Sequence, residues 1–176
     1  LENAVGAMAV GLKIGISPEK IKEAMETYEG VIRRFEFVVK TDKIVYIDDY
    51  AHHPEELRAC IAAARELYPG RMITGIFQPH LYSRTRDLAQ GFAESLDLLD
   101  AAFLLNIYPA RELPIPGVTT ELILGKMTLS SKQLVDREKL LAHLRENPPE
   151  VLITMGAGDI DQLVSPIAGI LQNCTR

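Results

Sequence analysis

The sequence is poor in the features that mark metal, disulfide-rich or membrane proteins. Its 176 residues include two cysteines, Cys60 and Cys174, which lack the spacing of a zinc or redox motif. We therefore predict no disulfide framework and a reducing compartment, the cytoplasm. Cys60 falls on the apolar face of a predicted helix, so we expect a buried thiol. No signal peptide occurs, and no apolar run nears the roughly 20 residues of a membrane span.

An excess of positive charge is also missing. The chain carries 19 Lys and Arg against 24 Asp and Glu, a net charge of −5, which argues against general coating of nucleic acid. With 47% hydrophobic and 24% charged residues, the composition is that of an ordinary globular protein, and the length suits one domain with a full core. The chain opens with LENAVGAMAVGL, which has no Met and already follows a helical pattern. We interpret it as a piece of a longer protein.

Residues 1–30 predict a pair of helices. The first covers 1–14, and the residues on its apolar face are Val5, Met8, Ala9 and Leu12. Ser17-Pro18-Glu19 is a typical helix start, with a capping hydroxyl, a proline at the first helical position and an acid at the positive end of the helix dipole. We expect this second helix to run to Glu29 and to stop at Gly30.

A switch to alternating polar and apolar residues follows. RRFEFVVK (33–40) and KIVYIDDY (43–50) flank Thr41-Asp42 and predict a β-hairpin. From Pro54 onward, helices and strands alternate. The predicted strands are the apolar runs 71–77, 101–107 and 150–156, a pattern typical of parallel strands covered on both faces. The predicted helices are one from Pro54 with the face Leu57, Cys60, Ile61, Ala64 and Tyr68, and others at about 86–98, 119–125, 136–146 and 159–172.

This alternation predicts an α/β fold with a doubly wound, mostly parallel sheet, entered through the hairpin and preceded by a short helical remnant. We divide the chain into the remnant at 1–30 and the α/β domain at 31–176. In such sheets, ligands bind beyond the carboxyl ends of the strands. The loops that follow predicted strands are DDYAHHP, QPHLYSRTRDL, YPARELPIPGVT and GAGDI. If the strands are parallel, these loops meet at one edge, and three of them carry groups suited to an anionic or carboxylate-bearing ligand.

The loop DDYAHHP admits three interpretations. A metal site would use Asp48 or Asp49 with His52 or His53, but adjacent histidines in an extended loop point apart and no further ligand pattern occurs. Pro54 could instead start a helix, with Asp49 bonded to turn amides. The loop could also present its polar groups to a substrate.

The loop QPHLYSRTRDL brings cationic and imidazole groups to the same predicted edge. An arginine can bind a carboxylate or phosphate through two hydrogen bonds, so we expect His80 and Arg84, in the loop, to contact ligand. Arg86 falls inside the predicted helix, where Asp87 can neutralise it. GAGDI lacks the full G-x-G-x-x-G pattern, so its glycines are expected to permit a tight turn and close helix packing rather than a dinucleotide site.

Taken in order, these motifs resemble one family. GVIRRFEF, DDYAHHPEEL, FQPHLYSRTRDL, IYPARELPIPGVT and TMGAGDI are similar to the Rossmann-like C-terminal domain of the Mur ligases, in the branch of the UDP-N-acetylmuramate–L-alanine ligases. LENAVGAMAVGL is similar to a helix near the end of that family's central ATPase domain. The resemblance covers essentially the whole chain and rests on five motifs in the right order.

The resemblance implies an ATP-dependent ligase of bacterial peptidoglycan synthesis. ATP phosphorylates the carboxylate of UDP-N-acetylmuramate, and the amine of L-alanine attacks the acyl phosphate, with Mg²⁺ bridging the ATP phosphates. The phosphate loop G-x-x-x-x-G-K-[ST] does not occur in the sequence. That loop and the magnesium ligands lie in the family's central domain. We therefore expect this fragment to be inactive alone, to hold no metal or catalytic residue of its own, and to work beside missing N-terminal and central domains.

The resemblance also implies roles for single residues. The residues implied to bind ATP are Arg34, Asp49 and Tyr50, with Asp49 on the ribose hydroxyls. The residues implied to bind the amino acid and product are His52, His80 and Arg84. Two positions depart from the family, since Leu81 stands where some members carry an arginine and Asn106 stands where an acid is expected.

Three other functions stay open. One is the related ligase that joins an intact tripeptide to the same sugar, which is similar at DDYAHHP, although FQPHLYSRT favours the alanine enzyme. Another is a stand-alone nucleotide- or carboxylate-binding module, against which the unfinished first helix argues. The last is a metal-dependent hydrolase that uses Asp48, His52 and His53.

Overall fold

The computed structural model describes residues 2–28 and 30–174, and the chain divides into two compact units, Leu1–Val31 and Ile32–Arg176. This division lies one residue from the boundary that we predicted. That the first unit belongs to a different domain stays a prediction. In the described part of the chain, no helix is both long and apolar enough to cross a bilayer.

The first unit is a pair of helices. They are α1 (Glu2–Lys13) and α2 (Pro18–Glu26). Ser17 caps α2, as its sequence predicts. The expected extension of α2 to Glu29 is wrong, because the backbone of Thr27 leaves the helical conformation at ψ 2° while its amide and hydroxyl both bond the Glu23 carbonyl. Leu1 and Glu29 themselves lie outside the described residues.

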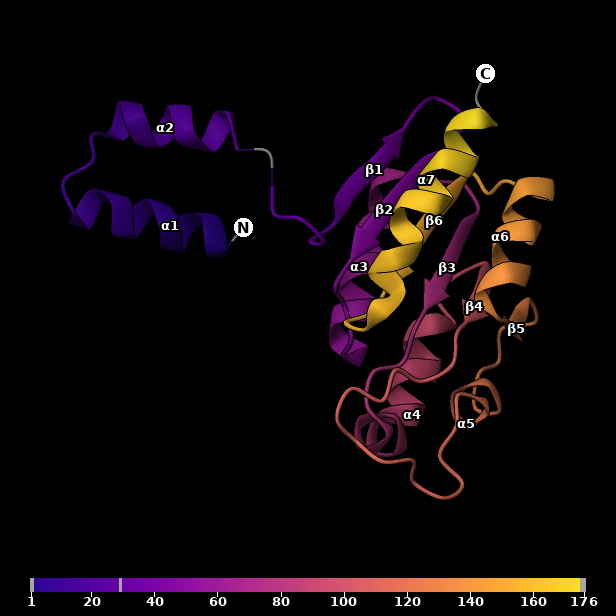
Figure 1. Cartoon of the computed structure of the whole chain (residues 1–176). Helices are drawn as coiled ribbons and strands as arrows, with labels where there is room; N and C mark the ends of the chain where they lie inside the picture. The colour runs from indigo at the N-terminus through magenta and orange to yellow at the C-terminus, as the bar shows by residue number, and fades with distance from the viewer. Residues whose placement is uncertain (1, 29, 175–176) are drawn as a thin grey trace. The chain divides into compact units, whose positions relative to one another are not determined.

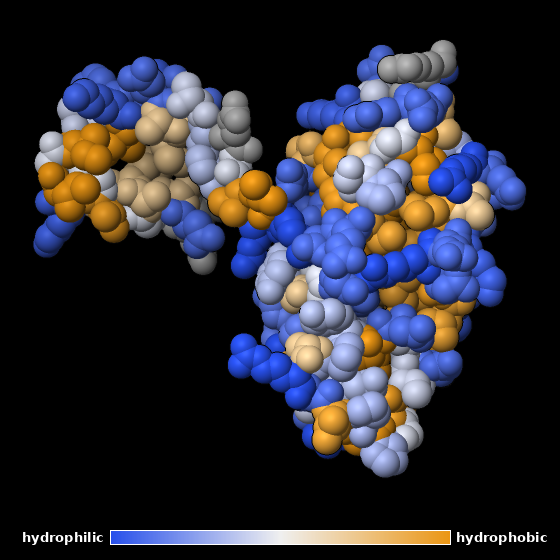
Figure 2. All heavy atoms as spheres, in the orientation of Figure 1, coloured by the Kyte–Doolittle hydropathy of each residue, from blue (hydrophilic) through white to orange (hydrophobic). Residues whose placement is uncertain are grey.

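Apolar side chains stay on the surface of this first unit, as Figure 2 shows. The large exposed ones include Val5, Val10, Leu12, Ile14, Ile16 and Met25. Of the residues described in this unit, only Gly11 is buried. Since two short helices enclose little apolar surface, α1 and α2 form no closed core of their own.

The second unit is built on one six-stranded sheet, drawn in Figure 1. Its strands are β1 (Glu36–Lys40), β2 (Val45–Asp49), β3 (Ile73–Phe77), β4 (Ala101–Leu104), β5 (Lys132–Leu134) and β6 (Val151–Met155). The order is β1-β2-β6-β3-β4-β5, in which β1 pairs antiparallel with β2 and the other neighbours are parallel. The predicted hairpin and the predicted mostly parallel α/β sheet are both confirmed.

Helices cover both faces of this sheet (Figure 1). One face holds α3 (Pro54–Leu67), α4 (Tyr82–Leu96) and α5 (Glu121–Leu124), and the other holds α6 (Arg137–Glu146), the 3₁₀ helix η1 (Asp159–Leu163) and α7 (Val164–Asn173). The side chains of β2 alternate between the two cores, with Val45 and Ile47 in the first and Tyr46 in the second. The predicted burial of Cys60 is confirmed, since it is 5% exposed.

Among the elements that start elsewhere than predicted, two affect the position of candidate site residues. β1 begins at Glu36 rather than within RRF, because Arg33 and Phe35 have φ of 60° and 51°, a left-handed conformation that a strand cannot contain. The helix expected from about residue 86 begins at Tyr82. Arg84 therefore lies in the first turn of α4 and not in a loop.

Two further differences lie around β4. The strand expected at 101–107 ends at Leu104, and beyond it the chain pairs with the segment after β3 only at an isolated parallel bridge between Tyr108 and His80. β5, three residues that pair with the far edge of β4, was not predicted from the sequence. A strand this short has too few residues to show either an apolar run or a period of two.

Candidate active-site surface

The carboxyl ends of β2, β6, β3 and β4 lie side by side, as the loop pattern predicted (Figure 1). The loops that follow them form one surface, which we call the carboxyl-end rim and define as residues 49–53, 78–84, 106–112 and 156–159. Two of these loops are joined through their backbones: the amide of Tyr108 lies 2.8 Å from the Pro79 carbonyl, and the amide of Leu81 lies 2.9 Å from the Tyr108 carbonyl.

His80 and Arg84 form a hydrogen-bonded pair on this rim. Arg84 Nη1 lies 3.1 Å from His80 Nδ1. Because a guanidinium only donates, His80 Nδ1 accepts and the ring proton sits on Nε2. Burial, and then the charge of Arg84, lowers the pKa of His80 below its ordinary value. The pair therefore combines a cation with a neutral N–H donor.

His52 lies next to this pair, with its ring centroid 6.3 Å from that of His80. Its Nδ1 is 2.9 Å from the Tyr50 carbonyl, which can only accept, so Nδ1 carries a proton and Nε2 is the position left for a ligand. His53 is the N-cap residue of α3, and burial followed by the charge of Arg84 lowers its pKa. The structure thus brings together the three residues predicted to contact the amino acid.

Glu56, in the first turn of α3, holds the histidine loop in place. Its Oε2 accepts the amides of His52 at 2.8 Å and His53 at 3.2 Å. Burial alone would raise the pKa of Glu56, but these hydrogen bonds outweigh it and the pKa is lowered. Glu56 is therefore an ionised anchor for the loop.

The two acids at the end of β2 bond inward. Asp49 accepts the amide of Phe35 at 2.7 Å and that of Ala51 at 2.8 Å, which is the turn-amide interpretation of the sequence. Burial raises the pKa of Asp49, although these two hydrogen bonds oppose the shift. Asp48 is 1% exposed and accepts from Thr154 Oγ1 at 2.5 Å.

The metal interpretation of DDYAHHP does not fit this geometry. Asp48 is 1% exposed and is enclosed by its partners Thr154 and Arg33, whose Nε lies 3.0 Å from it, so its carboxylate does not reach the surface where His52 lies. Within residues 2–28 and 30–174, no group of three or more His, Cys, Asp or Glu could hold a metal ion. The residues described in this loop therefore do not form the ligand set that the hydrolase interpretation needs.

Arg33 lies at the base of the rim, and its role was not predicted from the sequence. Its Nε bonds Asp48, and its Nη2 lies 2.6 Å from the Gly156 carbonyl, so one side chain ties the ends of β2 and β6 together. A signal was present, because an aspartate inside an apolar strand requires a buried partner. The neighbouring Arg34 is exposed, and its guanidinium lies 5.9 Å from the ring centroid of Tyr50. Two of the residues predicted to bind ATP are thus adjacent.

Gln78, also not predicted, links the loop after β3 to the segment after β6. Its amide group bonds Asp159 Oδ1 at 2.8 Å and the amide of Ile160 at 2.9 Å. A Cβ added at Gly158 would lie 2.6 Å from Gln78 Oε1 and 2.7 Å from Tyr108 Cβ. The glycine at 158 therefore serves close packing, as predicted, rather than the approach of a dinucleotide.

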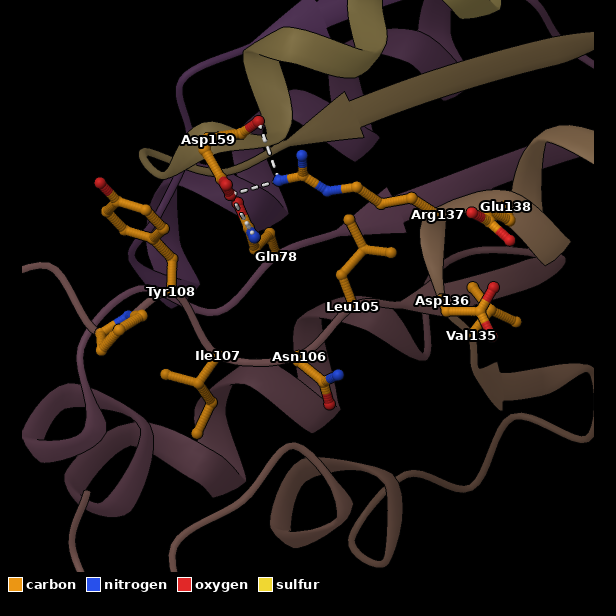
Figure 3. Close-up of a pocket in the computed structure, with 11 residues that line it drawn as sticks. Gln78, Leu105, Asn106, Ile107, Tyr108, Val135, Asp136, Arg137, Glu138 and Asp159 are labelled. Carbon is orange, nitrogen blue, oxygen red and sulfur yellow. Dashed lines mark hydrogen bonds and ion pairs between the residues drawn. The ribbon is translucent and has the colours of Figure 1, made fainter.

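A pocket of about 530 Å³, shown in Figure 3, has Gln78 in its lining. It shares Gln78 and Tyr108 with the carboxyl-end rim and continues to the start of α6. In Figure 3, Arg137 and Gln78 both point to Asp159, and Arg137 Nη2 is 2.5 Å from Asp159 Oδ1. Asn106, where an acid was expected, also lines it. Because the Arg137 guanidinium of this pocket is already paired with Asp159, we place the candidate site at the histidine–arginine cluster instead.

Arg86 and Asp87 behave as predicted. Both are exposed on α4, and Arg86 Nε lies 2.7 Å from Asp87 Oδ1. This pairing occupies the Arg86 guanidinium on the helix surface. Arg86 thus offers a matched control for Arg84, two residues earlier on the same helix.

Residues 33–158 match the family model described as Mur ligase, glutamate ligase domain. This chain belongs to the Mur ligase family. The predicted Rossmann-like fold of the Mur ligase C-terminal domain is also borne out by a solved structure. That structure, the UDP-N-acetylmuramate–alanine ligase of Thermotoga maritima, aligns with a TM-score of 0.76 and 27% identity over 98% of this chain and 37% of that one.

Relatives in the same family are more similar in sequence. A UDP-N-acetylmuramate–L-alanine ligase of Parabacteroides distasonis is 54% identical over 97% of this chain and 37% of its own length. One of Flavobacterium johnsoniae is 48% identical over 97% of this chain and 38% of its own length. This Mur ligase chain therefore spans well under half the length of the curated relatives that it matches.

Proposed function

We propose that this chain is the C-terminal part of an ATP-dependent ligase that joins L-alanine to UDP-N-acetylmuramate in peptidoglycan precursor synthesis. The support is its 54% identity, over 97% of its residues, to a longer relative of that name. The activity would belong to a longer cytoplasmic protein with N-terminal and central domains in the same chain. In that protein, α1 and α2 would form the end of the central domain.

The observation that carries the amino-acid role is the hydrogen bond between Arg84 and His80. With Nη1 directed to His80, Arg84 keeps further N–H donors, and His80 keeps Nε2–H. Two such donors side by side suit a carboxylate, which accepts charge-assisted hydrogen bonds. The L-alanine carboxylate binds there, and His52 Nε2 accepts a hydrogen bond from its amine.

The nucleotide role belongs to Arg34, Tyr50 and Asp49. Arg34 and Tyr50 are exposed and adjacent, and a guanidinium beside an aromatic ring suits a phosphate or a base. Each carboxylate oxygen of Asp49 already accepts one backbone amide, but a carboxylate has about four acceptor positions. Asp49 can therefore hold its turn and still accept a ribose hydroxyl.

In the proposed reaction, the terminal phosphoryl group of ATP moves to the muramyl carboxylate and ADP leaves. The alanine amine then attacks the acyl carbon, the new C–N bond forms, the C–O bond to phosphate breaks, and the amine loses a proton. The rim orients the amine and, by closing over the site, excludes water that would hydrolyse the acyl phosphate. As the family resemblance implies, we assign the Mg²⁺ ligands mainly to the central domain, and no metal step to this chain.

The test compares two substitutions in the full-length protein. Arg84→Ala should raise the KM for L-alanine by about tenfold or more, the loss expected for hydrogen bonds to a charged group, and leave the KM for ATP nearly unchanged. Arg34→Ala should instead raise the KM for ATP and leave the KM for L-alanine nearly unchanged. Arg86→Ala is the control, because its guanidinium bonds Asp87 on the helix surface. An unchanged KM for L-alanine in Arg84→Ala would contradict the amino-acid role, and turnover of an intact tripeptide in place of L-alanine would favour the recycling ligase.

A further inference from the structure

The helix that carries Arg84 starts without a cap of its own. Leu81, at the N-cap position, has φ 71° and an apolar side chain that cannot accept a hydrogen bond from the first turn. Its own amide donates to the Tyr108 carbonyl, and its carbonyl accepts the amide of Thr85 at 3.1 Å. The amides between them need acceptors from another part of the chain.

Glu112, in the loop after β4, supplies such an acceptor. Its Oε2 accepts the amide of Ser83 at 2.9 Å, and its Oε1 accepts the Ser83 hydroxyl. The Ser83 hydroxyl and amide, together with the amide of Tyr82, hold the pKa of Glu112 below its ordinary value. A carboxylate at this place is also favoured by the positive end of the α4 dipole.

The loop that carries Glu112 is itself anchored. The Glu112 amide lies 2.9 Å from the Pro109 carbonyl, which closes a tight turn, and the far end of the loop is held by the Thr120 hydroxyl, 2.9 Å from the Leu105 carbonyl. The ring of Tyr108 stacks on that of His80, with centroids 5.7 Å apart and planes 22° apart. The loop thus contacts both His80 and the first turn of α4.

We propose that Glu112 is a positioning residue for amino-acid recognition, which caps α4 from outside the helix and so keeps Arg84 beside His80. This inference rests on the proposed function. Arg84 is the third residue of α4, and its hydrogen bond to His80 spans the start of the helix. If the first turn frays, the two donors separate, and the apparent affinity for a carboxylate falls with the fraction of molecules that keep the turn.

The kinetic test is Glu112→Ala in the full-length protein. The KM for L-alanine should rise about fivefold, the ratio that corresponds to the roughly 1 kcal/mol of a typical cap, while the KM for ATP stays unchanged. Glu112→Gln keeps an acceptor oxygen for the Ser83 amide and should restore part of the loss. Leu113→Ala is the matched control, because its side chain is 84% exposed and adjacent in the same loop.

A second measurement follows the cap itself. In the 176-residue chain, Glu112→Ala should speed hydrogen exchange at the amides of Tyr82 and Ser83. Unchanged exchange at Ser83 would overturn the inference. A second outcome would also overturn it: Glu112→Ala speeds exchange but leaves the KM for L-alanine unchanged, while Arg84→Ala raises that KM. In that case the proposed function would stand. If Arg84→Ala also leaves it unchanged, the proposed function fails and the inference fails with it.

Discussion

The two halves of the carboxyl-end rim use their charged residues in opposite ways. On the β2 side, Arg33 and the buried Asp48 bond each other at the base of the rim. On the β3 side, Arg84 and His80 make one hydrogen bond to each other and keep other donors open. Charge alone therefore does not mark a ligand contact here.

The difference follows from burial. Asp48 is 1% exposed, and a carboxylate with so little access to water is tolerable only when protein donors replace the water. His80 and Arg84 are half-buried, so water can serve their remaining donors until a ligand replaces it. We expect substitution of Asp48 or Arg33 to lower stability, and substitution of His80 or Arg84 to lower affinity.

The largest expected effect on stability is that of Asp48→Ala. It leaves the Arg33 guanidinium without its buried partner, so the free energy of unfolding should fall by about 3 kcal/mol or more. Chemical denaturation measures this, with Asp42→Ala in the exposed hairpin turn as the control. A loss below about 1 kcal/mol would show that the Arg33–Asp48 pair contributes little to stability. It would also contradict the expected difference between that pair and His80–Arg84.

Gly158→Ala should come next, with a loss of about 1–3 kcal/mol, because the added Cβ would overlap Gln78 and Tyr108. Gly169→Ala is the matched control. A Cβ there meets nothing within 4 Å, so in helix α7 alanine should stabilise by up to about 1 kcal/mol. Equal effects of the two substitutions on the denaturation midpoint would contradict the close packing of Gly158 against Gln78 and Tyr108.

Glu56→Gln tests the anchor of the histidine loop through pH. The pKa of Glu56 is lower in the folded chain than its ordinary value, so its stabilising contribution is present above the ordinary pKa and is lost as the pH falls through the folded pKa. The glutamine variant cannot titrate, so it should lose less stability between neutral and acidic pH than the original chain. Parallel stability curves for the two chains would contradict this role.

The smallest expected effect on stability is that of Arg84→Ala. Its side chain is half-buried and bonds His80 alone among the described contacts, so the free energy of unfolding should change by no more than about 0.5 kcal/mol. Thermal denaturation beside the KM measurement would sharpen the comparison. A large loss of stability would show that Arg84 stabilises the fold, as the Arg33–Asp48 pair is expected to do.

Much of this fold is visible in local sequence patterns. The apolar runs and helix faces predict the strands and helices, and their alternation predicts the parallel sheet whose loops share one edge. The pairing of Arg86 with Asp87 was predictable for the same reason, since the two residues are neighbours in the chain. Patterns confined to a few residues are readable without the fold.

The start of α4 shows why other features were not predictable. Helix starts are recognised from a capping residue at the N-cap, and Leu81 is not one. The cap comes from Glu112, whose carboxylate meets Ser83 across 29 residues of sequence. Arg33 meets Asp48 across 15 residues, and Gln78 meets Ile160 across 82. The local sequence can show that a residue such as Asp48 needs a partner, but not which distant residue supplies it.

The sequence by itself determined which residue types stand at the ends of four strands, because strand and helix periodicity place those loops. It thereby determined that histidine, arginine and aspartate share one rim. Only the tertiary structure decided which of these charged side chains are paired within the protein and which keep donors or acceptors for a ligand. That choice depends on burial and on partners brought together by neighbouring parallel strands, which no local pattern encodes.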